Sequence, residues 1–193
     1  MRLSPLVAAL ALACLVGACA FSRPEVKSLR DPTADRVQFD SVILTSVSAL
    51  NAIPSQCGPA GNHRVRPEEF HVYQVVGTIA KVLHEPDHDY HVVITDLEHP
   101  RDHMVVESND PDFGGNAVSP YRERLAAGRR MFDALVAESG AQHLSDLKGT
   151  AVRVTGVGFF DVTHLQPGRS RSCIELHPIL AIERLIVNGE PKR

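Results

Sequence analysis

The chain has 193 residues, 44% of them hydrophobic, which is enough to bury a single globular core. Its formal net charge is −3, with 20 Lys and Arg against 23 Asp and Glu, so the overall field does not attract nucleic acid and we expect no such partner. Tryptophan is absent and aromatic residues make up 5% of the chain, which argues against a site built on aromatic stacking platforms.

Residues 1–18 have the order of a bacterial export signal. Arg2 supplies a positive charge, an apolar run follows from Leu6 to Val16, and small residues lead directly into Cys19. The apolar run is about ten residues long, which is too short for a membrane-spanning helix of roughly 20 residues. The letters LVGAC that end at Cys19 resemble a lipobox. We therefore expect cleavage before Cys19 and lipidation of its thiol, whereas an ordinary secretory signal is the alternative.

This signal predicts where the protein resides. Acyl chains such as palmitate on Cys19 would make the membrane a partner and anchor the protein in the bacterial cell envelope. Ala20 follows, rather than aspartate, which resembles lipoproteins sorted to the outer membrane. The expected location is the periplasmic side of that membrane.

The rest of the chain divides into four segments by composition. Residues 19–40 are polar and contain two prolines, which predicts a flexible, disordered tether. Residues 41–67 combine an apolar stretch with a loop rich in Pro and Gly, so we expect an irregular packing segment. Residues 68–187 form the predicted β domain, and residues 188–193 are a tail.

The β domain is predicted to be mainly β with one helix. β-branched and aromatic residues indicate strands over 70–83, 90–95, 103–107, 151–160 and 179–187. Between the third and fourth strands, Ser119 and Pro120 mark a helix start, and apolar residues recur at helical spacing until Gly140. The order β-β-β-α-β-β, with a first strand bent at Gly77, is similar to the OB-fold, a five-stranded barrel. A β-sandwich of another topology is the main rival.

Two cysteines lie within the mature chain beyond the lipidation position. Cys57 and Cys173 would both face an oxidising compartment after export, where disulfides persist. We predict that they form a disulfide; two free buried thiols are the alternative.

Histidines and acids gather in two segments that we consider as a binding site. Residues two apart share a face of an extended segment, as do Asp89 with His91 and Glu175 with His177. The second of these pairs falls in the connection between the last two strands, a position that lines the ligand face of OB-folds. The candidate ligand-binding residues are Asp89, His91, His164, Gln166, Glu175 and His177. The three histidines and Glu175 could hold a divalent transition metal; alternatively, the first segment is a solvated hairpin turn and the second only fixes its loop to the barrel.

Several stretches resemble an uncharacterised family of secreted bacterial proteins. The most specific stretch is TGVGFFD at 155–161, followed by the spacing H-x-Q-x-G that begins at His164 and by ELHP at 175–178. The resemblance covers about residues 57–183 and implies secretion, without implying an activity. This chain departs from the family after Gly168, where it reads RSRSC, which makes the disulfide a local feature.

Two functions stay open on the sequence alone. The first is a lipid-anchored, non-enzymatic module that binds a small ligand, a glycan or an envelope protein, because none of the common catalytic motifs occurs. The second is a metal-dependent hydrolase with a His/Glu site in the loop between the last two strands, in which Glu175 serves as ligand or base.

Overall fold

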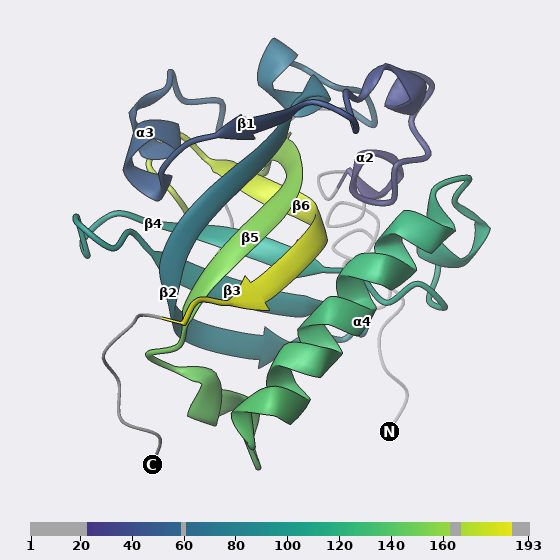
Figure 1. Ribbon diagram of the computed structural model, residues 1–193. Coiled ribbons are helices and arrows are strands. Elements are labelled where there is room, and N and C mark those ends of the chain that lie inside the picture. The colour runs from purple at the N-terminus through teal and green to yellow at the C-terminus, as the bar shows by residue number, and fades with distance from the viewer. Residues whose placement is uncertain (1–22, 59–60, 163–166, 187–193) are drawn as a thin grey trace, which may run out of the picture.

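The computed structural model describes residues 23–58, 61–162 and 167–186. In these residues the chain forms a closed five-stranded β-barrel with one long helix at its side (Figure 1). The barrel strands are Val72–His84 (β2), Tyr90–Thr95 (β3), His103–Ser108 (β4), Ala151–Phe160 (β5) and Ile174–Arg184 (β6). Within the described part, no helix is long and apolar enough to cross a membrane.

The barrel closes because its first strand pairs on both edges. β2 is antiparallel to β3 over its second half and to β5 over its first half. At the bend, a Cβ on Gly77 would lie 2.7 Å from the carbonyl oxygen of Thr95, so the two backbones approach too closely for a larger residue. β3 pairs with β4, β5 pairs with β6, and a parallel pairing at Val106 and Leu176 joins β4 to β6. This confirms the OB-fold-like order predicted from the sequence.

The helix α4, Arg122–Ser139, packs against β6 and supplies Phe132 and Leu135 to the barrel core. A Cβ on Gly128 would lie 2.1 Å from the carbonyl oxygen of Ile179, so helix and strand meet backbone to backbone. The helix begins two residues later than predicted and ends at Gly140, whose φ of 67° suits a glycine cap. The core also contains alternate residues of the strands: Val75, Ile79, Val92, Ile94, Met104, Val106, Val154 and Leu176.

Residues 23–40 are folded, so the flexible tether predicted for 19–40 is wrong for this part. They include the short helix α2 (Pro24–Lys27) and a 3₁₀ helix, Ala34–Arg36 (η1). Val26 and Leu29 are fully buried against the rest of the molecule. The composition misled because the charged residues of this segment find buried partners far along the chain. Residues 19–22, including Cys19, lie outside the described residues.

Residues 41–67 contain regular elements as well as the expected loop. Val42–Leu44 (β1) adds a parallel strand to the edge of β2, and Val47–Ala52 (α3) is a short helix capped by Ser46. Three further 3₁₀ helices are Pro67–Phe70 (η2), Asn116–Val118 (η3) and Leu144–Leu147 (η4).

The last strand begins five residues earlier than predicted. Pro178 has no N–H for a strand ladder, which is why the sequence favoured a strand start after it. In the structure the pairing of β5 with β6 shifts between Gly156 and Gly158, and Pro178 lies within this irregularity. Glu175 and His177 therefore lie on β6 and not in the loop where they were expected.

The predicted disulfide is confirmed. Cys57 and Cys173 are joined with an S–S distance of 1.99 Å across a sequence separation of 116 residues. The bond ties the segment after α3 to the residue that precedes β6.

Candidate functional site

Strand alternation places chemically active side chains on the outer face of the barrel. Along β3, β4 and β6, Val92, Val106 and Leu176 point into the core, so their neighbours point outward. These neighbours meet side chains from α2 and the adjoining loops and form what we call the charged cluster: Lys27, Asp89, His91, Glu107, Asp161, Glu175 and His177. Apart from Lys27, every member is at most 5% exposed.

Two segments of the same chain cover this outer face. From α2, the Lys27 Nζ lies 3.6 Å from Glu107 Oε2 and 3.7 Å from Asp161 Oδ2. From the β5–β6 loop, Gly168 packs on Val93 so closely that a Cβ would lie 2.3 Å from a Val93 methyl group. Its φ of 93° also favours glycine. In OB-folds this face is where ligands bind, and here the chain itself occupies it.

Glu107 lies at the centre of the charged cluster. Its Oε1 is 2.9 Å from His91 Nδ1 and its Oε2 is 2.7 Å from His177 Nδ1. Burial alone would raise the pKa of Glu107, but Lys27 and the two histidines outweigh it and hold that pKa well below its ordinary value. Glu107 is therefore a carboxylate that organises the positive groups around it.

His91 faces a hydrogen-bond acceptor on each side of its ring. Nδ1 lies against the Glu107 carboxylate, and Nε2 is 3.0 Å from the carbonyl oxygen of Pro167. Both nitrogens must therefore donate, which requires the protonated ring. Burial works against this charge, yet the bonds to Glu107 and Pro167 raise the pKa of His91 above its ordinary value. In this arrangement neither nitrogen offers a lone pair to a metal.

His177 differs from His91 because one of its ring nitrogens accepts a hydrogen bond. Its Nε2 lies 3.2 Å from the amide nitrogen of Asn109, which donates, so the lone pair of His177 is on Nε2. Asp89 Oδ2 is 4.0 Å from the same Nε2, while the other Asp89 oxygen accepts the backbone N–H of Asp110 at 2.6 Å. One ligand atom each from Asp89, Glu107 and His177 lie within 4.8 Å of one another. These three groups could hold a metal ion.

Two carboxyl groups of the charged cluster favour the protonated form. Burial raises the pKa of Asp89 to about 8, with Asp87 and Glu107 adding to the effect. Burial, followed by the nearby Asp161 and Glu107, raises the pKa of Glu175 well above its ordinary value. The Glu175 Oε2 is buried and has no hydrogen-bond partner among the described residues. Burial and the neighbouring acids thus disfavour the ionised forms of Asp89 and Glu175.

We expect Asp89 to make the stability of the metal-free protein depend on pH. Between about pH 4 and pH 8 the folded state keeps a proton that the unfolded state releases, so the free energy of unfolding falls as pH rises, by about 1.4 kcal/mol per pH unit for one proton. Asp89→Asn keeps an acceptor for the Asp110 N–H but cannot ionise. Urea unfolding in the presence of a chelator should therefore give a shallower pH dependence for this variant than for the wild type, and parallel curves would contradict the assignment.

The structure brings together four of the six predicted site residues. Asp89, His91, Glu175 and His177 lie in the charged cluster, whereas His164 and Gln166 lie outside the described residues. The sequence missed Lys27, Glu107 and Asp161. A signal for Glu107 was present, because an antiparallel register between 90–95 and 103–107 pairs it with His91. No local signal pointed to Lys27, since its segment was taken as a tether.

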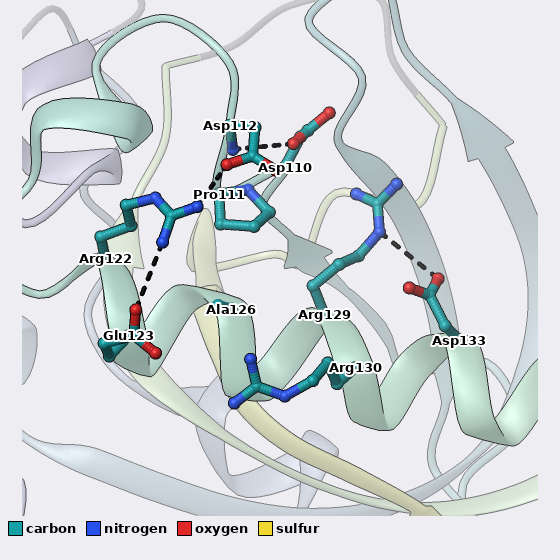
Figure 2. A pocket seen from close by; sticks show the side chains of 9 residues that line it. All are labelled: Asp110, Pro111, Asp112, Arg122, Glu123, Ala126, Arg129, Arg130 and Asp133. Atoms are coloured by element: carbon teal, nitrogen blue, oxygen red, sulfur yellow. Dashed lines mark hydrogen bonds and ion pairs between the residues drawn. The ribbon is translucent and has the colours of Figure 1, made fainter.

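A second candidate is an open hollow of about 390 Å³ between α4 and the loop that follows β4 (Figure 2). Two of its arginines face acidic groups: Arg122 pairs with Asp112, and Arg129 lies 3.4 Å from Asp133. The hollow adjoins the charged cluster through Asp110, whose N–H bonds to Asp89. Its lining charges largely compensate one another, so it has no strong preference for an anion or a cation.

Comparison with known proteins assigns the chain to no family. No family model and no curated protein matches the chain. Among solved structures, an aspartyl-tRNA synthetase from Leishmania major Friedlin is similar at 13% identity and a TM-score of 0.41, over 76% of this chain and 21% of its own. An apo tRNAIle2 agmatidine synthetase is similar at 10% identity and a TM-score of 0.26, over 77% of this chain and 34% of its own. The chain therefore spans about a fifth to a third of the proteins that it resembles.

Proposed function

We propose that the protein is a lipid-anchored protein of the bacterial cell envelope that binds a divalent transition-metal ion through Asp89, Glu107 and His177. The observation that carries the proposal is the meeting of three buried ligand groups within 4.8 Å of one another. Glu107 and His177 come from β4 and β6, and Asp89 is the residue directly before β3, so the barrel strands largely fix their spacing. One imidazole and two carboxylates form a donor set that suits zinc, manganese, iron or nickel.

The electrostatics of the charged cluster support a cation at this place. Lys27 and His91 balance the carboxylates of Glu107 and Asp161, whereas burial makes Asp89 and Glu175 favour the protonated form, and added positive charge would favour their ionised form. A divalent ion would supply it and release protons on binding. The buried Asn109 Oδ1, which has no hydrogen-bond partner among the described residues, is a further oxygen close to His177.

Burial favours an ion over a larger ligand. A hydrolytic metal needs an open coordination position that substrate and water can reach, whereas α2 and the β5–β6 loop cover this face. The same two segments would also prevent a glycan or a protein partner from reaching this face of the barrel. The geometry therefore favours metal binding without turnover over the hydrolase that the sequence left open.

The envelope location is proposed on the export signal and supported by the disulfide. A bond between Cys57 and Cys173 is typical of a protein that folds in an oxidising compartment. Mass spectrometry of the membrane fraction should find an acylated Cys19 as the first residue, and Cys19→Ala should abolish both the acylation and the membrane association. An unmodified protein that keeps residues 1–18 would contradict the proposal.

Metal binding can be tested on the full mature chain. After removal of metals with a chelator, titration with Co²⁺, Zn²⁺ or Mn²⁺ should load one ion per chain, as measured by elemental analysis and, for Co²⁺, by visible absorption. Loss of supporting residues around a metal weakens affinity by about 10–100-fold, so His177→Gln and Asp89→Asn, which remove ligands, should weaken it by at least about 100-fold.

A matched control is available in His99. It lies on the β3–β4 turn, its side chain is 65% exposed and it faces Asp96, so it offers a surface His–carboxylate pair outside the charged cluster. His99→Gln should leave the affinity unchanged. Absence of binding to the wild type, or an equal loss in all three variants, would overturn the metal proposal.

A further inference from the structure

We infer that η3 and the loop before it, residues 113–118, lie against the lipid bilayer when the protein is anchored. The inference rests on the proposed acylation of Cys19 and adds a second contact between the protein and the membrane. The partner of this surface is the interfacial region of a phospholipid bilayer.

The first step is the shortness of the link to the anchor. Arg23 is a fixed point of the fold, because its guanidinium donates to Glu69, to the carbonyl oxygens of His63 and Phe160, and through Nε to Gly61. Only four residue steps separate Cys19 from Arg23, a reach of at most about 14 Å. A domain of this size has a radius of gyration of about 16 Å. The surface around α2 must therefore stay within reach of the headgroups.

The second step is the position of residues 113–118 next to α2 (Figure 1). A Cβ on Gly115 would lie 2.7 Å from a guanidinium nitrogen of Arg30 and 3.3 Å from Ser28 Oγ, so the two segments are in contact. Arg30 in turn pairs with Glu25 of α2 at 2.8 Å. The anchor-proximal helix and this loop therefore share one surface.

The third step is the chemistry of that surface. Val118 is 71% exposed and Phe113 is 42% exposed, so this loop presents two large apolar side chains to the surroundings. The neighbouring acids Asp112 and Glu123 both pair with Arg122, so these three side chains together carry one net negative charge and repel lipid phosphates only weakly. Apolar side chains of this kind insert about 5–10 Å into the boundary between headgroups and acyl chains.

The absence of tryptophan from the chain makes a clean test possible. Val118→Trp, and separately Phe113→Trp, would each be the sole indole of the protein. In acylated protein reconstituted into phosphatidylethanolamine and phosphatidylglycerol vesicles, lipids brominated on their acyl chains should quench either indole at least about twofold, since the quencher reaches groups buried at this depth.

Leu97→Trp is the matched control. Leu97 is 47% exposed and follows β3 at the end where Thr95 pairs with His103, whereas residues 113–118 lie beyond the end where Tyr90 pairs with Ser108. The six-residue strands between these ends are about 20 Å long. The Leu97→Trp indole should therefore remain unquenched.

The outcomes separate the inference from the proposal beneath it. Acylated protein in which Val118→Trp and Phe113→Trp are quenched no more than Leu97→Trp would overturn the membrane contact and leave both the anchor and the metal site standing. A Cys19 without acyl chains would overturn the anchor and the contact together. Selective quenching near α2 supports the inference.

Discussion

Replacing Arg23 by methionine is expected to destabilise the protein by about 3–5 kcal/mol, which is the usual cost of leaving a buried charge without its partner. Arg23 and Glu69 are fully buried, and their side chains approach to 2.6 Å. Methionine removes the positive charge and the hydrogen bonds to the carbonyl oxygens of His63 and Phe160. For a chain of this length the midpoint of thermal unfolding should fall by roughly 6–20 °C, as measured by circular dichroism.

A surface ion pair of the same segment provides the control. Arg30 pairs with Glu25 at 2.8 Å, but both side chains are about a third exposed. Arg30→Met should therefore cost less than about 1 kcal/mol. The double variant Arg23→Met with Glu69→Gln should regain part of the loss, because the buried carboxylate is then neutral. Equal effects of Arg23→Met and Arg30→Met would show that residues 23–40 do not pack as described.

Removal of the disulfide is expected to have an effect of similar size. The bond closes a loop across a separation of 116 residues, and restricting such a loop in the unfolded chain is worth about 5 kcal/mol in the chain-entropy model. The double variant Cys57→Ala with Cys173→Ala should therefore unfold at a lower urea concentration. Wild-type protein in reductant should match the variant, and the variant itself should not respond to reductant.

The control for this experiment is the slope of the unfolding curve. A simple loss of stability moves the midpoint and leaves the dependence on urea largely unchanged. A wild-type midpoint that is the same with and without reductant would contradict the expected contribution. Since Cys173 directly precedes β6, which carries the proposed ligand His177, the variant should also bind metal more weakly.

The sequence predicted those parts of the fold that depend on local patterns. The strands over 90–95 and 151–160 were predicted with their observed bounds, because their β-branched runs are bordered by turn residues. The end of α4 at Gly140 followed from the same kind of local signal. The early start of β6 did not follow from a local signal. Pro178 normally argues against a strand, and only the irregular pairing with β5 accommodates it.

The candidate site was predicted only in part, because local spacing could be read from the sequence and long-range contacts could not. Spacing of two along a strand correctly placed Asp89 near His91 and Glu175 near His177. Bringing these two pairs together required the parallel contact of β4 with β6, which depends on the closed barrel. Lys27 is 80 positions from Glu107 in the chain, and a polar segment with prolines gives no sign that it will fold against a distant surface.

The packing of residues 23–40 on the barrel affects how the protein can be shortened. A chain that starts at residue 68, the domain boundary that the sequence indicates, would lack both Arg23 and Lys27. Glu69 would then lose Arg23, and Glu107 and Asp161 would both lose Lys27. Such a fragment should swell and aggregate near neutral pH, whereas a soluble form that begins just after Cys19 should keep the native fold. Residues 23–40 and the barrel are therefore one folding unit.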